Sequence, residues 1–330
     1  MEYEELISFS NLYQAYLACL KGKRHKQEVI DFSLELAKNL WSLHYDLKFQ
    51  KYRIAGYHEF KIYDPKERMI QAISFRDRIV QHMVVDNYLI PTLCKTFILD
   101  NVACQTNKGT ALAHQRIKRF LVHYYKKHGR NGYVLKIDIR RYFESIDHKY
   151  LKARLLHRVA DNKIKHLLIN IIDSYPLEIS KGLPMGNQTS QYFALLYLSD
   201  IDHYIKEKLR IKYYLRYMDD LLLIVKTKAE AKEIFIDLSK KIEEHLLAVN
   251  PKSHYFPLVN GFEMIGWRYH LTSTGKIIMT VRKSTKKRIK LRLYKGLDVN
   301  NHKNKSQIIA AYKGFLRNGN SYRFSTQLFD

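Results

Sequence analysis

Apolar residues recur every three or four positions over much of this chain, the spacing that places them on one face of a helix. Pro91 is expected to end one of these helices, because a proline ring interrupts the helical backbone. The pattern predicts helices over residues 6 to 20, 29 to 47, 76 to 89, 111 to 127, 140 to 175, 183 to 209 and 228 to 247.

Shorter runs rich in β-branched and aromatic residues predict strands. These runs are residues 52 to 63, 69 to 73, 133 to 139, 213 to 226, 255 to 256 and 265 to 269. Polar residues at 64 to 68 predict a hairpin turn between the first two runs, and Asp219-Asp220 predicts a tight turn within the fourth. Few strands among many helices indicate an α+β fold in which helices back a small antiparallel sheet.

The charge is strongly positive and unevenly placed along the chain. Its 330 residues contain 57 Lys and Arg against 32 Asp and Glu, a formal net charge of +25. The last 60 residues alone hold fourteen Lys or Arg and two Asp. Such a surplus favours a polyanionic partner, since cations that neutralise phosphates release condensed counterions. A merely solvated basic surface and an anionic membrane surface are the alternatives at this point.

Neither a membrane span nor a secretory leader is expected. The longest apolar stretches are far shorter than the roughly 18 residues that a span needs, and the chain starts with acidic residues. Cys19, Cys94 and Cys104 form no CxxC pair, which argues against a structural zinc site or a disulfide framework. We therefore expect a folded, cytoplasmic protein that has no membrane partner.

The adjacent carboxylates of Asp219 and Asp220 are the strongest chemical signal in the sequence. Asp is common in turns, so a bare Asp-Asp pair would be an ordinary hairpin turn. Here apolar strands flank the pair, and two like charges beside an apolar core are costly unless a cation neutralises them. Asp138 ends its own apolar strand 81 residues earlier, so two neighbouring strands would bring three carboxylates together.

Three carboxylates at one point predict a site for hard cations. Carboxylate oxygens suit Mg²⁺, which binds through one or two carboxylates and the phosphates of a substrate. Two such ions side by side are an arrangement used for in-line phosphoryl displacement. Together with the basic surface, the cluster predicts a nucleotidyltransferase that uses two Mg²⁺ ions, with Mn²⁺ as a substitute.

Three segments resemble the motifs of reverse transcriptases in their order and spacing. Tyr217-Met218-Asp219-Asp220 resembles motif C, residues 135 to 147 resemble motif A, and residues 182 to 191 resemble motif B. The resemblance covers most of the chain. Residues 65 to 82 resemble the fingers motifs of bacterial, group-II-intron-like enzymes. Residues 250 to 253 resemble motif D, and residues 262 to 267 resemble the primer grip.

Motif B departs from many retroviral and intron relatives at its end. Those relatives have Ser-Pro, whereas this chain has Ser190-Gln191. The run of residues 186 to 191 is similar to the variant found in reverse transcriptases of diversity-generating retroelements and of antiviral defence systems.

The resemblance implies a right-hand polymerase with fingers, palm and thumb. The implied parts are residues 1 to 134 for the N-terminal helices and fingers, 135 to 150 for the palm with motif A, 151 to 181 for further fingers and palm helices, 182 to 270 for the palm with motifs B, C and D and the primer grip, and 271 to 330 for a basic thumb.

The resemblance also implies roles for single residues. Asp138 and Asp219 would ligate both ions with the backbone carbonyl of Ile139, and Asp220 would complete the acidic cluster. Phe143 stands where the family places a ring that excludes a ribose 2′-hydroxyl. The implied dNTP-binding residues are Lys66, Arg68, Arg78, Phe143, Met185, Gly186, Gln191 and Lys252. The implied nucleic-acid-binding residues are Lys108, Arg116, Gly266, Trp267, Arg282, Lys283, Lys286, Lys287, Arg288 and Lys290.

Each of these roles has a plainer alternative. The cations at 66, 68 and 78 could grip template phosphates instead of a triphosphate, and Phe143 could be a core aromatic residue. Lys252 could be merely solvated, and the thumb cations could form an ordinary solvated helix face.

The function implied is RNA-directed DNA synthesis in a diversity-generating retroelement or an antiviral defence system. Its partners would be a template RNA, expected to be a dedicated structured noncoding RNA, a DNA or RNA primer, dNTPs and an accessory protein. Two other classes stay open. One is an untemplated or protein-primed nucleotidyltransferase, and the other is a non-catalytic RNA-binding scaffold with the same fold.

Overall fold

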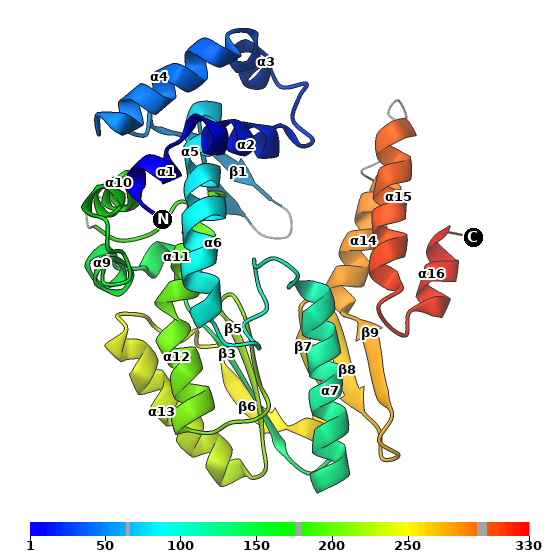
Figure 1. Ribbon diagram of the computed structural model, residues 1–330. Coiled ribbons are helices and arrows are strands. Elements are labelled where there is room, and N and C mark those ends of the chain that lie inside the picture. The colour runs from blue at the N-terminus through cyan, green and yellow to red at the C-terminus, as the bar shows by residue number, and fades with distance from the viewer. Residues whose placement is uncertain (64–66, 176–179, 296–301, 330) are drawn as a thin grey trace.

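The computed structural model describes residues 1–63, 67–175, 180–295 and 302–329 (Figure 1). Its N-terminal part consists of helices and one antiparallel hairpin, as the sequence predicts. These elements are α1 (Tyr3–Leu6), α2 (Phe9–Leu20), α3 (Gln27–Leu34), α4 (Leu36–Lys48), β1 (Tyr57–Ile62), β2 (Arg68–Ile73) and α5 (Phe75–Val84). In Figure 1 they form the upper part of the molecule, coloured blue to cyan.

The helix that begins at Phe75 does not end at Pro91, and that prediction was wrong. A π-helical turn over Val85–Leu89 follows α5, and α6 continues over Ile90–Leu93. Pro91 lies in the first turn of α6, where the missing backbone N–H costs least. The chain then runs through a short 3-10 turn at Cys94–Thr96 to α7 (Thr110–His128).

The central sheet has four antiparallel strands in the order β4-β5-β3-β6. Its strands are β3 (Tyr133–Asp138), β4 (Tyr214–Tyr217), β5 (Asp220–Val225) and β6 (His254–Pro257). The helices between β3 and β4 bury apolar residues in the same core as the strands of this sheet. They are α8 (Tyr142–Ser145), α9 (His148–Leu156), α10 (Asn162–Asp173), α11 (Gln188–Tyr197) and α12 (Ser199–His203), with a π turn at Tyr204–Lys208. After β5, α13 (Lys228–Glu244) also packs on β3 and β6. The expected small antiparallel sheet backed by helices is confirmed.

A second sheet of three antiparallel strands follows the first. It comprises β7 (Phe262–Met264), β8 (Trp267–Leu271) and β9 (Ile277–Val281). The strand expected near 265 to 269 is present as β8 but begins two residues later, because Ile265 and Gly266 have φ angles of 49° and 80° and form the turn between β7 and β8. The helix α7 joins the two sheets: it contacts β4 and β9.

Three helices end the chain at the edge of the second sheet: α14 (Lys283–Lys295), α15 (His302–Leu316) and α16 (Tyr322–Phe329). They stand apart from the N-terminal helices, on the right in Figure 1. Thr285, Ile289 and Leu293 form the buried stripe of α14, at the spacing of one helix face. Within the described residues, no helix has both the length and the apolar character that a membrane crossing requires.

Candidate active site

A two-residue turn between β4 and β5 carries the adjacent carboxylates. Met218 has a φ of 55°, a left-handed conformation that is unfavourable for a residue with a side chain. Tyr217 pairs with Asp220 across the turn, so Asp219 stands at its tip. The turn predicted from the sequence is therefore present, and it is held in a strained backbone conformation.

The end of β3 brings the third carboxylate next to this turn. Asp138 lies directly opposite Asp220 in the antiparallel register of β3 and β5. Residues that are directly opposite in an antiparallel pair point to the same face of the sheet. The prediction that Asp138 and Asp219-Asp220 lie on neighbouring strands is confirmed.

Asp138 is fixed by a loop that follows α13. The Asn250 side-chain amide donates to Asp138 Oδ2 at 2.7 Å, and the Asn250 backbone N–H donates to the Asp138 carbonyl at 2.8 Å. The Ser253 hydroxyl accepts from the Asp138 N–H at 2.9 Å. Ile139 pairs with Val249 of the same loop. The sequence comparison pointed to this loop as motif D but selected Lys252, whose side chain is exposed, and missed Asn250 and Ser253.

Burial and like charges make Asp219 an unusual carboxyl group. Burial, together with the nearby carboxylates of Asp220 and Asp138, raises the pKa of Asp219 from 3.8 to about 6, while a backbone hydrogen bond and Arg68 act in the opposite direction. A carboxyl with a raised pKa is one whose charged form lacks a stabilising partner. The site therefore favours the arrival of a cation.

The residues present have the chemistry to bind a divalent ion, although their side chains are not yet in coordinating positions. Within the described ranges, no three His, Cys, Asp or Glu side chains are gathered closely enough to hold a metal ion. The expected convergence of all three carboxylates on one point is thus not seen, because the Asp138 carboxylate is turned to Asn250. The donor set consists of hard carboxylate oxygens whose mutual repulsion an ion would relieve.

This repulsion predicts a stability change in Asp219→Asn. Above pH 6 the wild-type carboxylate is charged and weakens the fold, since its folded pKa lies above its unfolded value. The variant without metal, in EDTA at pH 8, should gain about 1–2 kcal/mol in free energy of unfolding. Urea denaturation checks this, and the gain should vanish as the pH falls towards 4, near the unfolded pKa. An equal or lower stability at pH 8 would contradict the stated electrostatics.

A fully buried ion pair anchors the turn from behind. Arg216 and Asp202 are both 0% exposed, and two guanidinium nitrogens of Arg216 donate to the Asp202 carboxylate at 2.6 and 2.8 Å. Arg216 also donates to the carbonyl of Met218 at 3.0 Å. Tyr214 donates its hydroxyl to the same carboxylate at 2.6 Å. The sequence analysis did not identify this pair; its signal was an Arg within the apolar strand before the turn.

A cavity of about 950 Å³ opens in front of the carboxylates. This volume lies within the range of about 300–1,000 Å³ that is usual for small-molecule sites. It brings together residues of the hairpin, motif A and motif B that sequence resemblance assigned to the nucleotide, namely Arg68, Phe143, Met185, Gly186 and Gln191. Asp219 and Asp220, which were assigned to the metal ions, line the same cavity.

The hairpin closes the cavity by docking on motif B. Gln71 of β2 donates its backbone N–H to the Met185 carbonyl at 3.2 Å, and its side chain accepts from the Met185 N–H at 3.1 Å. Gly186 has a φ of 110°, and a Cβ there would come within 3.2 Å of Ile70. A glycine is required at this position both by its backbone and by the close approach of β2. Gln71 was not predicted.

Arg78 lies outside this cavity and lines a smaller one of about 130 Å³, which shares Ile70 and Gly186 with it. Arg78 donates to the Ile73 carbonyl at 3.1 Å and approaches Glu28 at 3.4 Å. Gln81 also lines the small cavity and is 1% exposed. Within the described structure its side-chain amide has no hydrogen-bond partner. Lys66 lies outside the described residues.

Several residues assigned to nucleic acid are engaged within the protein. Lys108 donates to the carbonyls of Asn101 and Ile98, at 2.9 and 3.3 Å. Arg116 binds Asp100 at 2.6 Å. Trp267 is 0% exposed, so its side chain is not on the surface. Because the Trp267 side chain is buried, it would support a bound strand only through the residues packed around it, while the nucleic-acid roles of Lys108 and Arg116 stay predictions.

The cations at residues 282 to 290, which were assigned to the thumb, are placed in three ways. Lys286 and Lys290 lie over the ring of Phe324 on α16, at 5.1 and 5.9 Å from its centroid. Arg282 pairs with Glu263 at 2.7 Å. Lys283 and Lys287 are exposed and Arg288 is half-buried, while Gly266 occupies the turn beside α14.

In this chain, a small antiparallel sheet carries paired aspartates, and a hairpin docks above them. This is the arrangement expected of a right-hand polymerase. The chain belongs to the reverse transcriptase family, because residues 63–269 match the family described as reverse transcriptase (RNA-dependent DNA polymerase). It is 25% identical over 252 residues to Protein YkfC of Escherichia coli (strain K12). The match covers 63% of this chain and 65% of that protein.

Solved structures with the same fold include two telomerases. Telomerase from Candida albicans, in complex with a TWJ fragment of telomeric RNA, has a TM-score of 0.53 and 14% identity, covering 88% of this chain and 62% of that chain. Apo telomerase from Candida tropicalis has a TM-score of 0.51 and 15% identity, covering 68% and 48%. The expected right-hand polymerase fold is thereby confirmed. The chain spans less than two thirds of the length of these relatives.

Proposed function

We propose that this chain copies an RNA template into DNA by attack of a primer 3′-hydroxyl on the α-phosphate of a dNTP. The observation that carries the proposal is the register of Asp138 opposite Asp220, with Asp219 at the adjacent strained turn. These carboxylates border a cavity large enough for a nucleotide. Membership of the reverse transcriptase family supports the same reaction.

The acidic residues would hold two Mg²⁺ ions, or Mn²⁺ as a substitute. Asp138 and Asp219 would ligate both, together with the backbone carbonyl of Ile139, and Asp220 would complete the donor set. Such ions, when bound, lower the pKa of an attacking hydroxyl and neutralise charge on a leaving pyrophosphate. Asn250 orients the Asp138 carboxylate through its 2.7 Å hydrogen bond, and the Arg216–Asp202 pair holds the turn that presents Asp219.

The cavity walls would bind and select the nucleotide. Arg68 is close enough to Asp219 to lower its pKa and would meet the triphosphate, where fixed cations stabilise developing charge. Phe143 and Met185 line the same cavity, and the backbone of Phe143 accepts a 2.7 Å hydrogen bond from the Leu183 N–H. This bond ties the position of the Phe143 ring to motif B.

Phe143→Ala should relax the choice of sugar. Without the ring, nothing clashes with the 2′-hydroxyl of a ribonucleotide. The preference for dNTP over rNTP should therefore fall about 10- to 100-fold. Single-nucleotide incorporation with matched dNTP and rNTP measures this preference. Phe143→Tyr keeps the ring and should keep the preference. An unchanged preference in Phe143→Ala would assign Phe143 to packing alone.

The template is proposed to be a dedicated structured noncoding RNA, and the setting a cytoplasmic retroelement or antiviral defence system with an accessory protein. The variant of motif B at residues 186 to 191 supports this setting. The activity is tested by extension of a primer on an RNA template with Mg²⁺ and after EDTA treatment. Metal-dependent extension is expected. No extension, with intact RNA binding, would favour a scaffold, whereas DNA linked covalently to the protein would favour protein priming.

A further inference from the structure

An aromatic stripe runs along the outer face of α4. Trp41, Tyr45 and Phe49 follow one another at intervals of four residues and are 47%, 53% and 60% exposed. The rings of Tyr45 and Phe49 are parallel within 3°, with centroids 6.2 Å apart. The apolar packing of α4 uses the opposite face, which comprises Leu40, Leu43 and Leu47. Of the three rings, Trp41 also contacts the Phe9 ring of α2, with centroids 5.0 Å apart, so Tyr45 and Phe49 are the rings that the packing of α4 leaves available.

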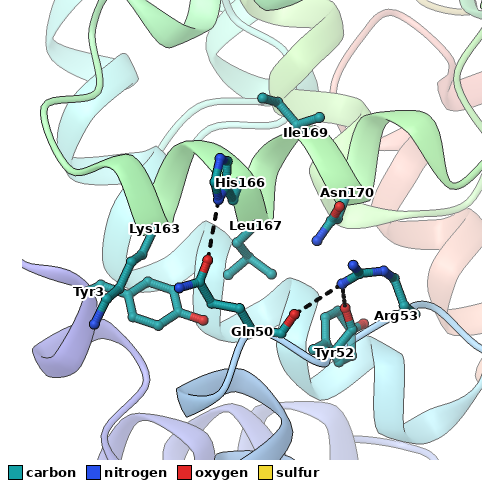
Figure 2. Close-up of a pocket in the computed structure, with 9 residues that line it drawn as sticks. All are labelled: Tyr3, Gln50, Tyr52, Arg53, Lys163, His166, Leu167, Ile169 and Asn170. Carbon is teal, nitrogen blue, oxygen red and sulfur yellow. Dashed lines mark hydrogen bonds between the residues drawn. The ribbon is translucent and has the colours of Figure 1, made fainter.

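The stripe ends beside a small pocket, lined by both polar and apolar side chains, between the N-terminal helices and α10 (Figure 2). Gln50 has a φ of 55°, which ends the helical run and turns the chain towards α10. The pocket has a volume of about 140 Å³. Arg53 lies on one wall, and Lys163, His166 and Asn170 project from α10 on the other.

The groups in this pocket are arranged to receive an anion. Arg53 uses one guanidinium nitrogen to bind the carbonyls of Gln50 and Tyr52, at 3.2 and 2.7 Å, which fixes the orientation of the group. His166 contacts the Gln50 side chain at 3.2 Å. Lys163 pairs with Glu4 at 2.7 Å on an exposed surface, where such a pair contributes little and exchanges easily.

We propose that the stripe Trp41-Tyr45-Phe49 and the pocket at its end bind a single-stranded segment of RNA outside the polymerase cavity. Bases would stack on the exposed rings, and one phosphate would enter the pocket and bind Arg53. Alternating flat rings and cations are the elements by which proteins bind single strands without reading their sequence. The pocket volume accommodates a phosphate but not a nucleoside as well.

The charges around the stripe favour RNA over a protein partner. Lys51 lies 6.0 Å from the Phe49 ring centroid and so places a cation beside the stripe. Asp46 pairs with Arg76 at 2.5 Å and Glu35 with Lys38 at 2.8 Å, while Glu4 and Asp161 lie beside Lys163 at the α10 wall. Arg53 donates to carbonyls rather than to a carboxylate, so Lys51 and Arg53 are the cations that a phosphate would meet at this surface.

This surface is separate from the cavity that holds the carboxylates. The two sites share no lining residue. In Figure 1, α4 and α10 lie on the side of the molecule away from α14, α15 and α16. A single-stranded RNA segment bound at this surface would therefore belong to a part of the RNA that is not being copied in the cavity. The inference thus rests on the proposed function only for the identity of that RNA.

Photo-crosslinking of the whole protein tests the inference. The probe is a single-stranded RNA of about 12 nucleotides that contains 4-thiouridine, and mass spectrometry locates the crosslinked peptides. We expect crosslinks to residues 41 to 53. Tyr45→Ala/Phe49→Ala should lose them and bind the probe at least about fivefold more weakly, since each stacked base is lost. Arg53→Gln should weaken binding and flatten its salt dependence.

Matched controls separate this site from the polymerase reaction. Leu34→Ala removes another exposed apolar residue, 79% exposed, from α3 and should change neither binding nor crosslinks. All these variants should extend a short primed template like wild type, so a failure of polymerisation tests the proposed function alone. Absence of crosslinks to residues 41 to 53, unchanged binding by Tyr45→Ala/Phe49→Ala, or a dimer that this variant dissociates would overturn the inference.

Discussion

Asp219→Asn should reduce dNTP incorporation on a primed RNA template at least about 10³-fold, because ligation of the ions supplies several kcal/mol of transition-state stabilisation. Asn keeps the size of the side chain and removes the charge. The strained turn at Met218 should survive, since Arg216 holds its carbonyl in both proteins. Rapid-quench measurement of single-nucleotide incorporation gives the rate, and binding of the primed template should change little.

A second carboxylate in the same cavity provides the control. Glu144 lines the cavity but pairs with Arg141 at 3.6 Å and lies away from the sheet register that joins Asp138 and Asp220. Glu144→Gln should therefore keep most of the incorporation rate. If Asp219→Asn remained fully active, or if both variants lost activity equally, the assignment of the acidic cluster would be wrong.

The second large effect concerns stability. Arg216→Met leaves the Asp202 carboxylate buried without its counter-ion, and such a change costs about 3–5 kcal/mol of unfolding free energy. Urea or thermal denaturation measures the loss. The exposed pair of Lys38 and Glu35 offers a matched control, because breaking it with Lys38→Met should cost less than about 1 kcal/mol.

A double variant separates the burial of charge from the packing. Arg216→Met/Asp202→Leu removes both charges, so it should be more stable than Arg216→Met alone. Its turn loses the hydrogen bond to the Met218 carbonyl, so incorporation should stay impaired even where stability recovers. Recovery of both stability and activity would show that the pair does not position the turn.

The sequence could predict the acidic site because its determinants are local. Asp219-Asp220 between two apolar strands forces a hairpin, and Asp138 ends an apolar run that must pair with it. The hairpin of β1 and β2 was predictable for the same reason, since both strands and the polar residues between them lie within one short segment.

Contacts between distant segments could not be predicted in the same way. The pairing of Arg216 with Asp202 depends on α12 passing behind β4, and the bond from Asn250 depends on the loop after α13 reaching β3. Trp267 is implied by its motif to bind nucleic acid, but packing against Phe315 buries its side chain. The π-helical turns before Pro91 and after His203 change helix ends without an apolar signal.

The central claim is that this chain adds deoxynucleotides under the direction of an RNA template. The direct test offers each of the four dNTPs singly, with Mg²⁺, on four primed RNA templates that differ only in the first unpaired base. We expect incorporation of the complementary nucleotide on each template. Incorporation of the same nucleotide on all four templates, or of none on any, would contradict it.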